Sequence, residues 1–400
     1  MFDVPISYLN SNDGSGVLAF GKGPMLTLHQ GNILQQLQEF LDQQSGNYII
    51  VSLSYDLKNQ IEDLTSQNIN ALEFPKVIAW VPKYVVEITG SKIDFLQGTK
   101  DTESVDFIHS FKAKSEQKTI APINCKLYPR ISKEEYLLHV QQLQKEIQMG
   151  NIYEVNYCQE FFAEHVELKD NLDAYFKLNR LTKAPYSIFL NINDYSVLSG
   201  SPERFISRKG NMLTSSPIKG TRKRGKNKAE DEMYKTELLH NQKERSENVM
   251  IVDLVRNDLS KLASPGSVKV DELFGVYTFE TVHQMISTIS CKLKNDPTFT
   301  DIIKATFPMG SMTGAPKISA MKLIDEHENF QRGIYSGSIG YIKPNGDFDL
   351  NVIIRTLTYN KDKKYLSCPV GSAITIKSDP DAEYEECMIK VQGILDGMNE

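Results

Sequence analysis

The strongest pattern of hydrophobic and polar positions lies between residues 132 and 162. Ser132 and Glu135 have the spacing of a capping box, which begins a helix. Apolar residues then follow every three or four positions and predict one buried helical stripe, made of Tyr136, Val140, Leu143 and Ile147. Gly150 is placed to end this helix. Residues 152–162 then alternate apolar side chains on one face, which predicts a strand.

Weaker patterns of the same kinds extend over the rest of the chain. Strands are predicted at residues 48–53, 77–81, 84–88, 186–190, 205–208, 337–342, 350–357 and 373–376. Helices are predicted at residues 30–43, 228–259 with room for a break, 315–325 and 380–395. Because strands outnumber helices and several lie within hairpin reach of each other, we expect an α+β fold built on antiparallel sheet rather than a doubly wound parallel one.

The polar segment 112–119 is the best candidate for a boundary along the chain. We therefore divide the sequence into an N-terminal segment, residues 1–120, and a main domain, residues 121–400. The segment 112–119 is too short and too weakly biased to predict that its two sides fold independently. We expect the N-terminal segment to pack on the same core as the main domain.

Composition narrows the class of protein. Of 400 residues, 40% are hydrophobic and 24% are charged, as in an ordinary globular protein. The net charge of −6 argues against binding nucleic acid or an anionic membrane. No apolar run is long enough to span a bilayer, and the start of the chain does not resemble a signal peptide. The 5 cysteines are scattered without a Cys-x-x-Cys pair, which favours reduced thiols in a cytoplasmic protein.

Lys219 is the first candidate for chemistry. It lies between Ile218 and Gly220, just ahead of the basic cluster 222–224. A lysine acts as a nucleophile only when its amine is partly deprotonated, and burial or neighbouring cations can achieve this. The basic cluster could supply such cations. The alternative is a solvated basic loop.

Two helices carry candidate metal ligands. Glu247 precedes a very apolar helical stretch, and Glu383 and Glu386 lie three residues apart on one face of the predicted last helix, together with Lys390. Either Ser378 or Asp379 is placed to cap that helix. Carboxylates from two helices can bind Mg²⁺, which takes oxygen ligands and keeps some water or substrate oxygens. The alternative is an ordinary solvated acidic face.

Three further sites are weaker alone. The segment 310–317 opens a helix, and its backbone N–H groups with the Ser311 hydroxyl could receive an anion, although it does not match a P-loop. A structural helix entry is the alternative. His283 is a single histidine, which is more often structural than catalytic. Arg355 follows an apolar run and is either a bidentate partner for a carboxylate or an ordinary edge-strand arginine.

Taken together and in order, these segments resemble the chorismate-utilising enzymes, the family of the anthranilate synthase and aminodeoxychorismate synthase large components. The resemblance runs from Arg130 to the C-terminus, whereas residues 1–120 match only diffusely. The matching segments are 201–205, 217–221, 247–258, 281–283, 310–317, Tyr335 with 337–341, 354–356 and 383–386. The resemblance implies two antiparallel sheets packed as a sandwich with helices outside, and a chorismate-binding catalytic domain at residues 121–400.

Within that family, the residue before Gly-Thr in the Pro-Ile-x-Gly-Thr segment separates two activities. Anthranilate synthases look like Pro-Ile-Ala-Gly-Thr, whereas aminodeoxychorismate synthases carry lysine, as Lys219 does here. The resemblance therefore implies amination of chorismate at C4 by ammonia, in the para-aminobenzoate branch that leads to folate. Two successive displacements through a covalent lysine would retain the stereochemistry at C4. The alternatives are anthranilate synthase component I and a non-catalytic chorismate-binding protein.

The resemblance also implies how the substrate and a metal would be bound. Glu247 and Glu386 would bind Mg²⁺ with Glu383 close by, and the metal would hold the ring carboxylate of chorismate. Arg355 and Tyr335 would hold the carboxylate of the enolpyruvyl arm.

Four further residues receive roles from the resemblance. Glu203 would act as general acid for the departing hydroxyl, because hydroxide is a weak leaving group. His283 would line the pocket near that hydroxyl. Ser311 and Lys317 would border the substrate.

The run from Gly371 to Ala373 departs from the family pattern. The family shows Gly-x-Gly where this chain has Gly371-Ser372-Ala373. Gly371 would help to bind the carboxylate of the enolpyruvyl arm through backbone N–H groups. Ala373 lacks the freedom of glycine at positive φ, so we expect this carboxylate contact to differ.

The ammonia source is inferred from the cysteines. Glutaminase domains of related complexes use a Gly-x-Cys-x-Gly elbow, and none of the 5 cysteines stands in one. We therefore expect a separate glutamine amidotransferase subunit as partner, with free ammonia as an alternative substrate.

Overall fold

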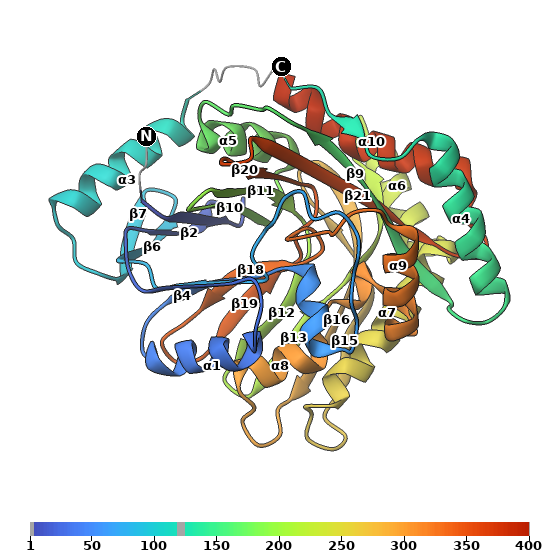
Figure 1. Ribbon diagram of the computed structural model, residues 1–400, viewed down its shortest axis with the longest axis horizontal. Helices are drawn as coiled ribbons and strands as arrows, with labels where there is room; N and C mark the ends of the chain where they lie inside the picture. The colour runs from blue at the N-terminus through green and yellow to red at the C-terminus, as the bar shows by residue number, and fades with distance from the viewer. Residues whose placement is uncertain (1–3, 118–124, 400) are drawn as a thin grey trace.

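The computed structural model describes residues 4–117 and 125–399 and contains two large antiparallel sheets (Figure 1). Every pair of neighbouring strands within them is antiparallel. The first sheet has the order β17 (Gly314–Ala315), β9 (Glu154–Ala163), β21 (Tyr365–Ile374), β20 (Thr356–Asn360), β11 (Tyr195–Ser201), β10 (Tyr186–Ile192), β1 (Ile6–Asn10), β2 (Ser15–Phe20), β6 (Tyr84–Thr89) and β7 (Lys92–Gln97), with β8 (Tyr128–Pro129) beside β9.

The second sheet faces the first. Its order is β14 (Ile218–Lys223), β16 (Val282–Lys292), β13 (Met212–Ser216), β12 (Arg204–Lys209), β19 (Phe348–Asn351), β18 (Ser338–Ile342), β4 (Ile49–Leu53), β5 (Val77–Trp80) and β3 (Met25–Leu28), with β15 (Lys269–Thr278) beside β16. Side chains of both sheets, including Trp80 and Ile188, form one buried cluster between them. The two sheets are therefore packed as a sandwich.

Helices cover the outer faces of this sandwich (Figure 1). The helices are α1 (Ile33–Gln43), α2 (Lys58–Ile61), α3 (Thr102–Ser115), α4 (Lys133–Gln148), α5 (Asn171–Thr182), α6 (Lys228–His240), α7 (Gln242–Ser260), α8 (Phe299–Thr306), α9 (Lys317–His327) and α10 (Pro380–Asn399), with short 3₁₀ turns η1 (Tyr55–Leu57) and η2 (Gly310–Met312). Apolar residues of α3, α4, α5 and α10 pack on the first sheet, and those of α1, α7 and α8 pack on the second. The predicted α+β sandwich is confirmed.

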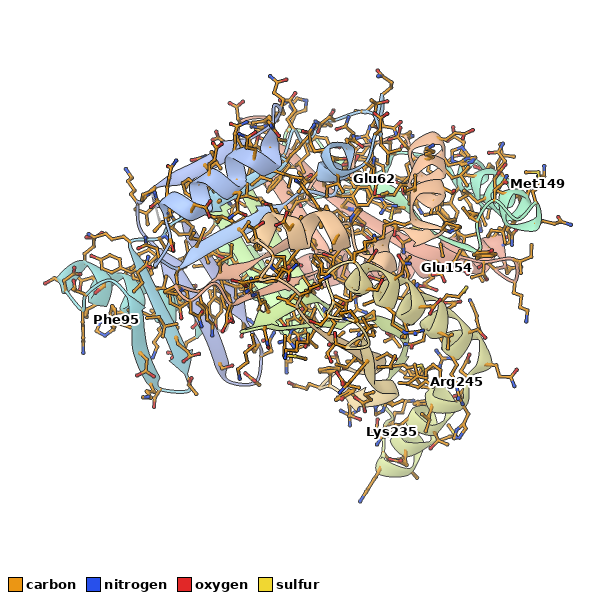
Figure 2. All side chains as sticks on the ribbon, turned by 90° about the horizontal axis from the view of Figure 1, so that it is seen from below. Glu62, Phe95, Met149, Glu154, Lys235 and Arg245 are labelled. Carbon is orange, nitrogen blue, oxygen red and sulfur yellow. The ribbon has the colours of Figure 1, made fainter. Side chains whose placement is uncertain are left out.

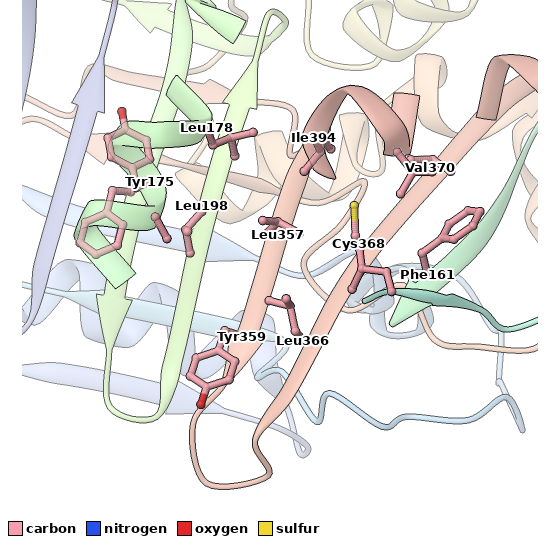
Figure 3. Packing of buried hydrophobic residues seen from close by; sticks show 14 of the residues in the cluster. Phe161, Tyr175, Leu178, Leu198, Leu357, Tyr359, Leu366, Cys368, Val370 and Ile394 are labelled. Atoms are coloured by element: carbon pink, nitrogen blue, oxygen red, sulfur yellow. The ribbon is translucent and has the colours of Figure 1, made fainter. Parts of the chain in front are cut away.

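Figure 3 shows part of the layer between the first sheet and its helices. Ile394 of α10 and Leu178 of α5 belong to the same buried cluster as Leu198, Leu357 and Val370 on strands β11, β20 and β21. Each buried aliphatic side chain contributes roughly 1.5–3 kcal/mol by leaving water. This contact fixes α10, and with it the acidic residues of its first turns, against the strands.

The helix predicted after residue 131 forms as α4. The Ser132 side chain accepts a hydrogen bond from the Glu135 N–H, and the Glu135 carboxylate accepts one from the Ser132 N–H. Gly150 follows the helix with a φ of 83°, which favours glycine. The capping box therefore begins this helix and the glycine ends it, as predicted.

The predicted helix 228–259 is broken at Asn241. This residue ends α6, and its side chain caps α7 by accepting a hydrogen bond from the Glu244 N–H at 3.0 Å. Asp379 caps α10 in the same way, accepting from the Ala382 N–H at 2.9 Å. Both caps lie within one or two turns of the acidic residues predicted to bind metal. The capping residues therefore help to position these acidic residues.

The prediction of one strand over residues 350–357 is wrong. The segment forms the end of β19 in the second sheet and the start of β20 in the first, and the chain crosses between the sheets at residues 352–355. Arg355 has a φ of 51°, in the left-handed region, and its C=O accepts from the Gly200 N–H at 3.0 Å. Residues 352–354 at the crossing are all apolar, so the pattern of hydrophobic positions does not show the turn.

The candidate boundary at 112–119 begins inside helix α3, which continues to Ser115, and its last two residues lie outside the described part of the chain. Strand β1 pairs with β10 in the first sheet, and β4 pairs with β18 in the second, so the N-terminal segment supplies strands to both sheets. The division at residues 120 and 121 stays a prediction. Across residues 4–117 and 125–399, no helix has the length and apolar character needed to cross a membrane.

Candidate active site

Lys219 lies buried where the edges of the two sheets meet. It belongs to β14 of the second sheet, and its Nζ donates to Oε1 of Glu154 on β9 of the first sheet at 2.7 Å. The exposed fractions of the two side chains are 10% and 2%. In Figure 2, Glu154 lies within the body of the molecule, while the exposed Met149 lies at its rim. The Lys219 amine is therefore an interior group and not part of a solvated loop.

Local backbone geometry aims this lysine inward. The register between β14 and β16 shifts between Ile218 and Thr221, as at a β-bulge, which redirects the side chain within it. Gly220 has a φ of 88°, and a Cβ there would lie 2.9 Å from Leu238 Cδ1. The backbone conformation therefore favours glycine next to Lys219, and a larger residue would also have to displace the end of the Leu238 side chain on α6.

Two other buried carboxyl groups lie near the lysine. Burial raises the pKa of Glu203 to about 7, although the Ser311 hydroxyl and Lys219 act in the opposite direction. Ser311 Oγ donates to Glu203 Oε1 at 2.7 Å. Burial likewise raises the pKa of Glu247 to about 7, opposed by Lys219. A carboxyl group with a pKa near 7 can be protonated at neutral pH and can donate a proton.

The basic cluster does not activate Lys219 as expected. Arg222 pairs with Glu244, and Arg224 pairs with Asp231, so both guanidinium groups are directed to other carboxylates. Burial opposes the charged form of Lys219, but Glu154 and Glu247 favour it, and its pKa is raised. The basic cluster therefore does not supply the neighbouring cations, and the neighbouring acids favour the ammonium form of this amine.

Helices α7 and α10 bring the predicted metal ligands together. Glu247 Oε1 is buried without a hydrogen-bond partner. Lys243 Nζ lies 3.9 Å from that atom and 3.6 Å from Glu383 Oε1, so the two acids share one cation. Glu386 accepts from Lys390 Nζ at 2.7 Å. Burial opposes ionisation of Glu386, but the nearby cations, Lys390 above all, outweigh it and lower its pKa.

The fit of these acids to a metal ion is partial. Within the described residues, no three acidic, histidine or cysteine groups form a complete metal site. Glu247 Oε1 nevertheless lacks a hydrogen bond, with Lys243 Nζ 3.9 Å away, and a buried carboxylate oxygen in this position is stabilised by a closer cation. A pair of glutamates that leaves positions for substrate oxygens suits Mg²⁺.

Arg355 and Tyr335 lie at the crossing between the sheets. Within residues 4–117 and 125–399, the Arg355 guanidinium has neither a hydrogen bond nor an ion pair. Burial lowers its pKa, and the neighbouring Tyr335 acts in the opposite direction. A half-buried guanidinium without an ion pair, on a residue with a left-handed backbone, is suited to bind a carboxylate.

Gly371 lies in strand β21 opposite Cys158 of β9. Its C=O accepts from Lys390 Nζ at 2.7 Å, and a Cβ at this position would lie 2.5 Å from Cys158 Sγ. Ala373 continues the same extended strand opposite Asn156 and does not have a positive φ. Position 373 therefore does not require the freedom of glycine at positive φ, and the expected difference in the carboxylate contact stays a prediction.

The remaining predicted residues, Lys317 and His283, contact other partners. Lys317 Nζ donates to Asp258 Oδ2 and to the Thr306 C=O, and burial lowers its pKa. The ring nitrogens of His283 lie 2.9 Å from Asp231 Oδ1 and 2.9 Å from Thr278 Oγ1. Roles of these two side chains at the substrate stay predictions.

Two residues of this region were not predicted. Glu154 accepts a hydrogen bond from Lys219 Nζ, and its signal in the sequence is an acidic residue within the predicted strand 152–162. Arg332 pairs with Glu328 and donates to the Met312 C=O and the Asn156 C=O at 2.8 Å each. This one buried guanidinium ties the η2 turn, which carries Ser311, to strand β9, which carries Glu154.

The arrangement combines four chemical capacities. It holds a buried amine, a carboxylic acid with a pKa near 7, a buried glutamate oxygen without a hydrogen bond beside a second helix that carries acids, and an unpaired guanidinium. Such a set suits a substrate with two carboxylates, one bound through the cation and one through the arginine. It also suits attack by the amine on a substrate that loses a hydroxyl group.

Known proteins resemble this chain over most of its length. Residues 8–396 match the sequence profile of the chorismate binding enzymes. Aminodeoxychorismate synthase component 1 of Salmonella typhimurium is 42% identical over 261 residues, which are 65% of this chain and 57% of that protein. The corresponding Escherichia coli protein is 41% identical, with 66% of this chain and 58% of that protein covered. The matches thus span less than two thirds of these relatives.

Other similarities support the same fold. The anthranilate synthase component I-like protein of Synechocystis is 32% identical over 92% of this chain and 75% of its own length. The crystal structure of anthranilate synthase component I from Streptococcus pneumoniae superposes with a TM-score of 0.81 at 24% identity, covering 95% of this chain and 92% of that one. With a profile match from residue 8 to residue 396, the chain belongs to the family of chorismate binding enzymes.

Proposed function

We propose that this protein replaces the C4 hydroxyl of chorismate by an amine, using ammonia, and so forms 4-amino-4-deoxychorismate for the para-aminobenzoate and folate branch. The observation that carries this proposal is the buried Lys219 amine, within reach of three buried carboxyl groups. The relatives named aminodeoxychorismate synthase component 1 support it. The family membership supports chorismate as the substrate.

Substrate binding would use two separate groups. Arg355 and Tyr335 would hold the carboxylate of the enolpyruvyl arm, with the backbone around Gly371 close by. Glu247 and Glu386 would hold Mg²⁺, with Glu383 nearby. When bound, this ion would neutralise and orient the ring carboxylate.

The chemistry would run through Lys219 and Glu203. The neutral Lys219 amine adds to C2, the two ring double bonds shift, and the bond from C4 to its hydroxyl breaks. Glu203 gives its proton to that hydroxyl, which leaves as water. Ammonia then adds to C4, the double bonds shift back, and the lysine leaves C2 as an amine. Glu203 regains a proton from the ammonium formed at C4, so the sum is chorismate and ammonia giving the amine and water.

The source of ammonia would be a separate glutamine amidotransferase subunit. All 5 cysteines are free thiols, and Cys158, Cys291, Cys368 and Cys387 are buried. Burial raises the pKa of Cys291 to about 11 and that of Cys368 to about 12, which makes them poor nucleophiles. Free thiols also suit a cytoplasmic enzyme.

The product of the purified chain tests this proposal. The protein is incubated with chorismate, an ammonium salt and Mg²⁺, and the product is identified by its mass and ultraviolet spectrum. We expect 4-amino-4-deoxychorismate. Fluorescent anthranilate would instead show an anthranilate synthase, and unchanged chorismate would show a non-catalytic binding protein. Either of these results would overturn the proposal.

A further inference from the structure

The ion pair between Lys219 and Glu154 raises a question about proton transfer. An ammonium ion has no lone pair, so the Lys219 amine must lose a proton before it can add to C2. The structure pairs that amine with the Glu154 carboxylate, and its side chain is only 10% exposed, so it has little access to water. The proton therefore needs an acceptor inside the site.

Glu154 is the acceptor in contact. In the part of the chain that the structure describes, no other carboxylate forms an ion pair with Lys219 Nζ. Glu154 Oε1 lies 2.7 Å from this atom, and Oε2 is buried without a hydrogen-bond partner. The second oxygen is therefore free of any competing donor.

The other acidic residues near the Lys219–Glu154 ion pair have different proposed roles. Glu203, from the connection between β11 and β12, accepts from Ser311 and needs its own proton for the leaving hydroxyl. Glu247, from α7, faces the predicted metal position together with Lys243, and Glu386 is paired with Lys390. Neither Glu203 nor Glu247 can take the lysine proton without losing its proposed role.

We propose that Glu154 is a catalytic residue that accepts the proton of Lys219 and later returns it. This inference rests on the proposed function. As the amine attacks, an Nζ–H bond breaks and a Glu154 O–H bond forms, while the nitrogen lone pair makes the bond to C2. After ammonia has displaced the lysine, the free amine takes this proton back. The pair thus returns to ammonium and carboxylate, and no external base is consumed.

Glu154→Gln tests the inference because glutamine can accept a hydrogen bond but cannot take a proton. Rates of C4 amination are measured for wild type and variant from pH 6.5 to 9 at equal total ammonium, so the pH dependence of free ammonia cancels in their ratio. We expect the variant to be about 100-fold slower at pH 7. We also expect the ratio of wild-type to variant rate to fall roughly tenfold with each pH unit, because solvent must then deprotonate the lysine.

Two further variants serve as controls. Glu244→Gln removes a nearby carboxylate that pairs with Arg222 and not with Lys219. We expect its rate to stay near that of the wild type with the same pH profile. Glu154→Asp keeps a proton acceptor, so we expect a slower enzyme whose ratio to wild type does not change with pH. This variant also covers the case in which Glu154→Gln does not fold, as judged by circular dichroism.

The possible outcomes separate this inference from the proposed function. A Glu154→Gln variant with a constant ratio at every pH would show that Glu154 only positions the lysine, and would overturn the inference alone. A variant as fast as the wild type would do the same, as would an Asp variant whose ratio falls with pH. A wild-type protein that forms no 4-amino-4-deoxychorismate would overturn the proposed function, and the inference with it.

Discussion

Glu203 shows how burial prepares a single residue for acid chemistry. The carboxyl group is 4% exposed, and burial raises its pKa from an ordinary value of 4.5 to about 7. Ser311 and Lys219 lower the pKa but do not offset burial. At neutral pH a large fraction of this group carries the proton that a departing hydroxyl requires.

The raised pKa predicts an unusual dependence of stability on pH. The unfolded chain ionises Glu203 at lower pH than the folded protein does, so the free energy of unfolding falls as pH rises from about 4.5 to 7. Glu203→Gln removes this effect and keeps an acceptor for Ser311. We expect the variant to be more stable than wild type at pH 8, on the order of 2 kcal/mol, with little difference at pH 4.5.

Urea unfolding at the two pH values, without substrate or Mg²⁺, checks this prediction. Glu39→Gln, at an exposed position on α1, is the matched control and should show no such difference. An equal effect of Glu203→Gln at both pH values would contradict the assignment. The same variant should aminate chorismate about 100-fold more slowly, since glutamine cannot protonate the hydroxyl.

At the scale of elements, the helix ends could be predicted, because they depend on residues that are close together in the sequence. The capping box at Ser132 and the cap at Asp379 are readable because helix ends are determined by side chains within a turn. The crossing at residues 352–355 was not predicted, because it depends on the pairing of β19 and β20 with strands far away in the sequence. Glu154 was missed because the partner that explains it, Lys219, lies on the other sheet.

Two positions of strand β21 allow one substitution to be compared with a control in the same strand. A Cβ at position 371 would lie 2.5 Å from Cys158 Sγ and 2.9 Å from the Tyr157 C=O, so Gly371→Ala must displace β21 or β9. We expect it to destabilise the protein by about 1–3 kcal/mol and to raise the KM for chorismate. Ala373→Gly changes an extended position, and we expect KM to stay within about twofold. Thermal unfolding and steady-state kinetics measure both effects.

The opposite pattern would contradict our description of this strand. If Ala373→Gly lowered KM strongly while Gly371→Ala had no effect, position 373 would be the one that limits binding of the carboxylate. The extended backbone of β21 would then not explain why alanine is tolerated at position 373.

At the scale of the whole molecule, the site depends on the sandwich as a unit. The ion pair of Lys219 and Glu154 joins one sheet to the other, and Arg332 joins the η2 turn to strand β9. The segments that make up the site are spread over residues 154–390. The family resemblance could group most of them, but their contacts follow only from the packing of the sheets.

Whether the chain can use glutamine or only ammonia as nitrogen donor depends on all of its cysteines. Since its cysteines lack an elbow and most are buried, we expect no turnover with glutamine as sole nitrogen donor and clear turnover with an ammonium salt. A steady-state assay of the purified chain with each donor measures this. Turnover with glutamine by this single chain would contradict the need for an amidotransferase partner.

The most direct test of the central claim is the mass of the protein after mixing with chorismate and Mg²⁺ but without ammonia. We predict a rapidly formed species heavier than the protein by chorismate less one water, located by peptide mapping at Lys219 and absent from Lys219→Ala. If the wild type aminates chorismate at C4 yet never carries this adduct, or if Lys219→Ala aminates at the same rate, covalent catalysis by this lysine is contradicted.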